Sequence, residues 1–341
     1  MNNSGIFSKK RAITFLIAAL LPFIALSQSC STGKVDEQVA VFLKTKGPDQ
    51  TPAQIKATPI EQMRNDGPKS FAKLPEDSVR RIKITKDNIK VNVVKASSKS
   101  GLPIIINFHT GGFIKPLSPW MEYEAMRLSR KFNAVVFDID YRVAPENKFP
   151  VAVNDSYSSF LWVLEHGAEY GGDPAKIILT GTSAGANLAA LIVHKAKKKG
   201  KLQPIKLVIL NCPPTDNPMT SYYSSYEDNA RSYLLTKDLV IFYFQSYLDK
   251  SEWYKSNPEM WPIHEKDLSG LPSHLIITTE FDVLRDEGIA YGKRLEKAGT
   301  DVSIKCFPHQ IHDFMGLPQE SGERKRVYEL MGEAIAKAIG M

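Results

Sequence analysis

Residues 176–200 constrain the fold more than any other stretch, because a short apolar run, a tight turn and an amphipathic run follow one another there. The run at 176–180 predicts a strand, and the apolar spacing from 184 to 199 predicts a helix. Between them, Gly181-Thr182-Ser183-Ala184-Gly185 fits the pattern G-x-S-x-G. In this context the pattern predicts a strained strand-to-helix turn that pushes the hydroxyl of Ser183 out of the sheet.

The rest of the body alternates between strand-like and helix-like segments. Residues 103–108 and 134–139 are continuous apolar runs, as expected of parallel strands that are buried on both faces. Helical patterns cover 121–132, 153–170 and 324–339. Runs at 81–84 and 89–94 alternate instead, which predicts edge strands with one wet face. This order predicts an α/β doubly wound sheet.

Charge gives little evidence for a macromolecular partner. The chain has 341 residues, a formal net charge of +7 and a sequence pI of about 9.0. The lysines are scattered, and no arginine-rich or zinc-spaced element accompanies them. We therefore expect no nucleic-acid partner and assign the basic balance to solubility.

The N-terminus has the pattern of an export signal. Lys9, Lys10 and Arg11 precede an apolar run at 12–26, which is short for a membrane span. We expect a signal peptide at 1–29 and export to a bacterial periplasm or to the medium. Cleavage after Ser27 and lipoprotein processing, with a lipid anchor on Cys30, remain alternatives.

The two cysteines of the body are Cys212 and Cys306. Each is associated with a different apolar run, at 207–211 and 302–305, and a third run at 275–279 lies between these in sequence. If the three strands are neighbours in that order, the cysteines are too far apart for a disulfide. We expect two free, buried thiols.

A nucleophilic serine needs a base, and the base needs a carboxylate that orients it. In this fold the acid and then the histidine follow the serine, each after a strand. His309 and His312 lie in the segment 308–314, after the run at 302–305. Four carboxylates follow the run at 275–279: Glu280, Asp282, Asp286 and Glu287. Reach from the strand end favours Glu280 or Asp282, because the later pair is expected to open a helix.

The segment His109-Thr110-Gly111-Gly112-Phe113 follows the strand predicted at 103–108. A glycine-rich turn at this place can aim backbone N–H groups at a developing oxyanion, together with the N–H group after the serine, that of Ala184.

These motifs together resemble the hormone-sensitive lipase family of α/β-hydrolases, in its G-T-S-A-G branch. The resemblance runs from about residue 103 to the C-terminus. Residues 109–112 resemble H-G-G-G, residues 141–146 (YRVAPE) resemble Y-R-L-A-P-E, and residues 282–286 (DVLRD) resemble D-P-L-R-D. The resemblance implies a triad of Ser183, Asp282 and His312, and an oxyanion hole of Gly111, Gly112 and Ala184.

The resemblance also implies the architecture. It is a mostly parallel eight-stranded sheet with helices on both faces and a helical cap. We expect an N-terminal arm at 30–80 as part of the cap, and a catalytic domain at 81–341 with a cap insertion at about 212–271.

Four positions depart from the family pattern: Thr110, Thr182, His309 and Asp313. Thr182 puts the hydrogen bonds beneath the serine in doubt. The residues at 309 and 313 are expected to affect substrate shape more than mechanism.

The leading hypothesis is a serine carboxylesterase that acts on short-chain acyl esters through an acyl-enzyme, without a metal or organic cofactor. An amidase, formamidase or deacetylase of the same fold is the alternative, because both chemistries use the same triad. A ligand-binding protein without catalysis, like the plant gibberellin receptors, is less favoured because all three triad residues are present. A small-molecule ester is the expected partner, and a homodimer is an alternative to a monomer.

Overall fold

The computed structural model describes residues 33–65, 79–84, 89–317 and 321–340. The predicted signal peptide, its cleavage site and Cys30 lie outside these ranges. Within them, no helix is both long and apolar enough to cross a membrane.

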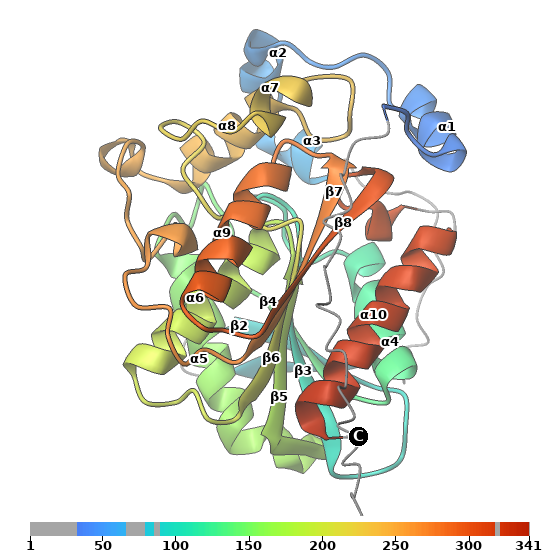
Figure 1. The fold of residues 1–341 in the computed structure, drawn as a ribbon, viewed down its shortest axis with the longest axis vertical. Coiled ribbons are helices and arrows are strands. Elements are labelled where there is room, and N and C mark those ends of the chain that lie inside the picture. Colours follow the sequence, from blue (N-terminus) through green and yellow to red (C-terminus); the bar gives the residue numbers. More distant parts are fainter. Residues whose placement is uncertain (1–32, 66–78, 85–88, 318–320, 341) are drawn as a thin grey trace, which may run out of the picture.

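One sheet of eight strands forms the centre of the molecule (Figure 1), which confirms the predicted architecture. Its spatial order is β1-β2-β4-β3-β5-β6-β7-β8, and the six strands β3 to β8 run parallel to one another. The strands are β1 (Val79–Ile84), β2 (Ile89–Lys95), β3 (Leu102–Phe108), β4 (Val135–Asp140), β5 (Gly172–Thr182), β6 (Ile205–Asn211), β7 (Ser273–Phe281) and β8 (Val302–Ile311).

The prediction that 89–94 forms an edge strand with one wet face is wrong. β2 is hydrogen-bonded on both sides, antiparallel to β1 and to β4. It is buried on both faces, and only Lys90 is exposed. The alternation in the sequence came from the polar residue Asn92. Its side chain is nevertheless buried, and burial is tolerated because its amide donates to Glu122 Oε1 at 2.7 Å.

Helices cover both faces of the sheet (Figure 1). α4 (Pro119–Phe132) and α10 (Gly322–Ile339) lie on one face, and α5 (Val151–His166), α6 (Ala184–Lys198) and α9 (Arg285–Lys297) lie on the other. Short 3₁₀ segments complete the connections: η2 (Gly167–Tyr170), η3 (Lys250–Glu252), η4 (Pro262–His264) and η5 (Phe314–Gly316).

The remaining helices gather beyond the carboxyl ends of the parallel strands (Figure 1). They are α1 (Glu37–Thr45), α2 (Pro52–Ala57), α3 (Ile60–Arg64), α7 (Ser225–Asp228) and α8 (Lys237–Tyr247). We call these five helices the cap. They come from two regions that are far apart in sequence, and α2 packs against α8.

The two body cysteines differ from the prediction in one respect. Cys212 is free and fully buried, as expected. Cys306 is disulfide-bonded and half-buried, so the prediction of a second free, buried thiol is wrong. The bond does not join it to Cys212, because β7 lies between β6 and β8. Cys306 lies on β8, an edge strand whose residues 302–306 are all exposed or half-buried, so it is not enclosed as the prediction assumed.

Candidate active site

Ser183 lies at the turn between β5 and α6. Its backbone has φ 55° and ψ −122°, an unusual conformation for a residue with a side chain. The close packing of strand and helix holds this turn. A Cβ atom on Gly185 would lie 1.9 Å from the carbonyl oxygen of Phe108 in β3, so only glycine fits there. The strained turn predicted from the sequence is therefore present.

The hydrogen bonds beneath the turn come from β6. The N–H group of Ser183 donates to the Asn211 carbonyl at 2.8 Å, and the side-chain amide of Asn211 donates to Thr182 Oγ1 at 3.2 Å. The threonine that departs from the family pattern is thus an acceptor for a neighbouring strand. Asn211 was not singled out by the sequence analysis, because nothing local marks a strand-end asparagine as a partner of residues 29 positions earlier.

Asp282 and His312 lie together at the ends of β7 and β8. His312 Nδ1 donates to Asp282 Oδ2 at 2.7 Å, and both side chains are buried. Burial lowers the pKa of His312, but the charge and hydrogen bond of Asp282 more than offset this, so the pKa lies well above its ordinary value. Since Asp282 holds the proton on Nδ1, Nε2 is left to accept a proton.

The acid loop is itself anchored. Asp282 Oδ1 accepts from the Leu284 N–H group at 2.9 Å. Asn229, from the segment after α7, donates to the Glu280 and Asp282 carbonyls at 3.2 and 3.1 Å. The sequence analysis missed Asn229 as well, since it lies in a segment without periodic pattern.

The other three carboxylates of this region have structural partners. Glu280, the penultimate residue of β7, accepts from the backbone N–H groups of Gly33 and His309. Asp286 accepts from Ser224 Oγ and from the Ser225 N–H group, in the first turn of α9. The last is Glu287, which accepts from the Thr215 N–H group and the Tyr226 hydroxyl. Of the four candidates, only Asp282 contacts His312.

His312 directly follows β8, which extends to Ile311 rather than ending near residue 305. Within the segment 308–311, Ile311 pairs with Phe281 of β7, after a register shift between Thr279 and Phe281. His309 interrupts it with a positive φ of 66°, and its Nδ1 donates to the Lys34 carbonyl at 2.8 Å. His309 thus anchors the N-terminal arm.

Cys212 lies beside the pair. Its Sγ, an oxygen of Asp282 and a nitrogen of His312 all lie within 4.8 Å of one another. A tetrahedral metal ion at about 2.0–2.2 Å from its nitrogen and oxygen ligands would hold these ligands more than about 3 Å apart. The 2.7 Å contact between His312 Nδ1 and Asp282 Oδ2 is therefore a hydrogen bond. Burial and the charge of Asp282 raise the pKa of Cys212, which keeps the thiol neutral.

The turn after β3 also lies beside Ser183, because Gly112 and Ser183 line the same cavities. Gly112 has φ 60°, and a Cβ there would lie 2.5 Å from the ring of Tyr243 in the cap, so the position excludes side chains. The N–H groups of Gly111, Gly112 and Ala184 donate to no acceptor in the described part of the chain. Ala184 begins α6, where an N–H group has no intrahelical acceptor.

His109 supports this turn from below. Its ring stacks on that of Tyr141, with centroids 4.0 Å apart, and the Tyr141 hydroxyl donates to the His109 carbonyl at 2.9 Å. Burial lowers the pKa of His109 to about 4, so the imidazole is neutral. His109, from the H-G-G-G-like segment, and Tyr141, from the Y-R-L-A-P-E-like segment, therefore support the glycine turn together.

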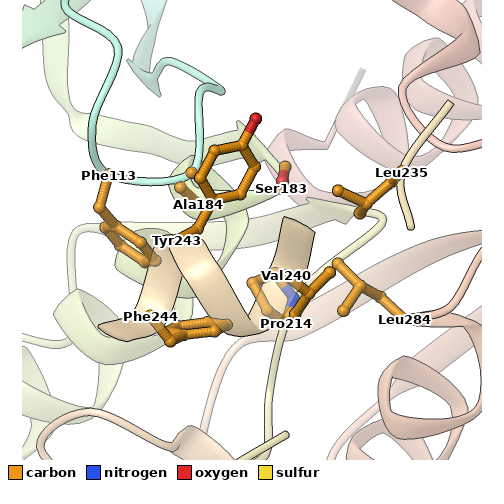
Figure 2. A pocket seen from close by; sticks show the side chains of 10 residues that line it. Phe113, Ser183, Ala184, Pro214, Leu235, Val240, Tyr243, Phe244 and Leu284 are labelled. Carbon is orange, nitrogen blue, oxygen red and sulfur yellow. The ribbon is translucent and has the colours of Figure 1, made fainter. Parts of the chain in front are cut away.

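Two cavities meet at Ser183. The larger has a volume of about 490 Å³ and is lined by His312, by the glycine turn and by residues from α1, α4 and α8. The smaller has a volume of about 20 Å³. Figure 2 shows it between Ser183 and Ala184 on one side and Val240, Tyr243 and Phe244 of α8 on the other. Tyr243 and Leu235 line both cavities.

The predicted residues are thus distributed around one point. Ser183, His312, Gly111 and Gly112 line the larger cavity, and Ser183, Ala184 and Gly112 line the smaller one. Asp282 lies behind His312 and reaches neither. Asp313, which departs from the family glycine, lines the larger cavity; burial raises its pKa to about 6.

Comparison with known proteins agrees with this geometry. Residues 105–316 match the model of a family described by its α/β-hydrolase fold. The chain is 34% identical to the carboxylic ester hydrolase LipN of Mycobacterium tuberculosis, over 67% of this chain and 61% of LipN. It is 32% identical to the carboxylesterase NlhH of the same organism, over 64% of this chain and 68% of NlhH.

A solved structure is similar over nearly its whole length. The hyperthermophilic esterase of Pyrobaculum calidifontis superimposes with a TM-score of 0.76 at 28% identity, covering 89% of this chain and 98% of that one.

Proposed function

Since this chain belongs to the α/β-hydrolase family that the hormone-sensitive lipase motifs indicated, we propose that it is a serine carboxylesterase acting on esters of short acyl groups, of roughly two to eight carbons. One observation carries the proposal. His312, joined to the buried Asp282 at 2.7 Å, lines the same cavity as a serine on a strained strand-to-helix turn. The chain spans 61% of the length of LipN.

In the first half of the reaction, Ser183 Oγ attacks the ester carbonyl while His312 Nε2 takes its proton. Asp282 fixes the tautomer and stabilises the imidazolium that forms. The carbonyl oxygen becomes negative and accepts hydrogen bonds from the N–H groups of Gly111, Gly112 and Ala184. These donors have no competing acceptor among the described residues, so they are available when charge develops.

The tetrahedral intermediate then collapses. His312 gives its proton to the alcohol oxygen, which leaves, and Ser183 carries the acyl group. Water enters, loses a proton to His312 and attacks the acyl carbon, and the acid is released as Ser183 regains its proton. Residues of α1 and α8 in the cap line the cavity in which these steps take place.

The test is hydrolysis of 4-nitrophenyl acetate and butyrate, with the corresponding anilides beside them. We expect turnover of the esters to exceed that of the anilides, and Ser183→Ala to lower kcat by about 10⁶-fold. Its melting temperature should stay close to that of the parent protein, because the hydroxyl faces a cavity. A Ser183→Ala protein that keeps most of its activity contradicts the proposal, and faster anilide cleavage assigns an amidase.

We also propose that the protein is exported, with either cleavage after Ser27 or lipid attachment at Cys30. The basic residues at 9–11 and the short apolar run at 12–26 support this proposal. Mass spectrometry of the mature N-terminus from the native host distinguishes the two forms, and an intact Met1 would contradict export.

A further inference from the structure

The strand that leads to His312 is irregular just before that residue. Two successive partner pairs of β7 and β8 enclose the irregularity: Thr279 with Phe307, and Phe281 with Ile311. Residues 308–310 of β8 therefore lie opposite the single residue Glu280 of β7, as in an extended β-bulge. A bulge interrupts the ladder of hydrogen bonds, so its backbone N–H and carbonyl groups need other partners.

Groups outside the ladder bind the backbone of this bulge. The N–H group of His309 donates to Glu280 Oε2 at 2.8 Å, and its carbonyl accepts from the Asp36 N–H group at 2.9 Å. The imidazole Nδ1 of His309 donates to the Lys34 carbonyl at 2.8 Å. Glu280 is 3% exposed, and its other oxygen accepts from the Gly33 N–H group at 3.0 Å. Residues 33–36 thus supply contacts that a regular strand pairing would otherwise supply.

His309 is one of the four departures from the family pattern, and its backbone conformation favours glycine. Its φ of 66° lies in the left-handed region, where a side chain costs free energy. The imidazole offsets part of this cost through its hydrogen bond to Lys34. The side chain at this position therefore serves the contact with the N-terminal arm.

An apolar contact adds to these hydrogen bonds. Val39 of α1 is 1% exposed and packs with Phe281 and Ile311 in a small cluster that is separate from the main core. These two partners directly precede Asp282 and His312 in the chain. Helix α1 therefore contacts both strand ends from which the acid and the base project.

Building on the proposed esterase function, we propose that residues 33–45 are a positioning element of the active site. Docked on Glu280, His309 and the strand ends, this segment holds the bulge of β8 in the conformation that places His312 against Asp282. The same helix lines the larger cavity through Phe42 and Thr45. It therefore has two separate roles, one in the cavity wall and one in the alignment of the base.

Val39→Ala tests the second role without changing a charged group or a cavity wall, since Val39 lines neither cavity. Val41→Ala is the matched control, because the same change is made on the same helix at a side chain that is 51% exposed. We expect kcat for 4-nitrophenyl acetate to fall by about threefold to tenfold in Val39→Ala, with KM within about twofold. In Val41→Ala both constants should stay within about twofold of the parent values.

A second measurement does not depend on turnover. Burial lowers the pKa of His312 and Asp282 more than offsets this, so an NMR titration of the imidazole reports their contact. Asp282, Cys212 and Asp313 face His312, and none of them is changed. We expect the midpoint to fall by at least about 0.5 pH unit in Val39→Ala and to stay in place in Val41→Ala. An unchanged midpoint in Val39→Ala, or an equal fall in Val41→Ala, overturns the proposal.

His309→Gly tests the same docking from the side of the bulge. Glycine suits the φ of 66° and keeps the backbone hydrogen bonds, so the variant should fold, but it loses the bond to Lys34. The midpoint of His312 should fall here too. In the double variant with Val39→Ala, kcat should fall by less than the product of the two single effects, because both changes loosen one contact. A full product contradicts a shared docking.

The two proposals fail in different ways. If the midpoint falls as expected but the parent protein cleaves no ester, the positioning role stands and the esterase function fails. If the parent protein cleaves esters and Val39→Ala behaves like Val41→Ala in both measurements, the esterase function stands and the positioning role fails.

Discussion

The floor of the site and the cap above it are built in different ways. The floor is the carboxyl edge of β3, β5, β6, β7 and β8, where buried hydrogen bonds hold the residues of the proposed triad: Asn211 to Ser183, Asp282 to His312 and Asn229 to the acid loop. The cap instead joins two distant segments chiefly by apolar packing, in which Ile55 of α2 and Val240 and Phe244 of α8 are buried. Such packing is non-directional, whereas hydrogen bonds fix the orientation of the groups that they join.

This difference separates two properties of the enzyme. The floor sets the chemistry, because its groups cannot shift without breaking buried bonds. The cap sets which substrates enter, because α8 supplies part of the wall of both cavities and α1 part of the wall of the larger one. Changes in the floor should therefore alter kcat by orders of magnitude, and changes in the cap should mainly alter ratios between substrates.

The largest effect after loss of Ser183 is expected for the acid. Asp282→Asn keeps the shape but removes the charge and favours the wrong tautomer of His312. We expect kcat to fall by about 10⁴-fold. Steady-state kinetics with 4-nitrophenyl acetate measures this.

Asp286→Asn is the matched control, because the same change is made four residues away in the first turn of α9. It should leave kcat within about twofold and lower stability by about 0.3–1 kcal/mol, the usual effect of a charge at a helix N-terminus. If Asp286→Asn is the inactive protein and Asp282→Asn is active, the acid has been misassigned.

A cap change should act on selectivity. Val240 of α8 is buried and lines the small cavity, which contains Ser183 but not His312. Because the leaving alcohol must lie near His312, the acyl group is expected in the small cavity, and Val240→Ala enlarges its space. We expect kcat/KM for 4-nitrophenyl butyrate relative to the acetate to rise by about tenfold, within the range that one or two methylene groups discriminate. If the ratio stays the same, the acyl group does not occupy this cavity.

The pH dependence of the reaction tests the role of the floor residue His312. His312 must be neutral to accept the serine proton, and Asp282 raises its pKa well above the ordinary value of 6.5. The rising limb of kcat/KM should therefore have its midpoint above pH 6.5. Cys212 stays a neutral thiol there.

Asp313 also titrates near the site, with a pKa of about 6. The profile is therefore measured in Asp313→Asn as well, so that the remaining limb belongs to His312. A midpoint below pH 6.5 in both proteins means that the carboxylate does not stabilise the imidazolium.

Much of the floor could be predicted from the sequence, because its signals are local. Continuous apolar runs identified the buried parallel strands, and Gly181 to Gly185 identified the strained turn. Asp282 could be favoured over Glu280 because it follows the strand end, and β7 does end at Phe281.

Other features depend on contacts between distant segments, which leave no local pattern. Asn211 and Asn229 have the same appearance in sequence as any loop asparagine, yet they hold the serine turn and the acid loop. Strand β2 alternates like an edge strand because Asn92 is polar, although a partner on α4 satisfies it. The larger cavity is lined by residues of α1 and of α8, which are almost 200 positions apart in the sequence, so no local pattern predicts it.

The central claim is that Ser183 is the nucleophile activated by His312 and Asp282. The most direct measurement is covalent labelling with a serine-directed alkyl phosphonate, followed by peptide mapping by mass spectrometry. We predict one label on Ser183 in the parent protein, a labelling rate at least about 10³-fold lower in Asp282→Asn, and no label in Ser183→Ala. A label on any other residue, or equally fast labelling without the Asp282 carboxylate, would contradict the account.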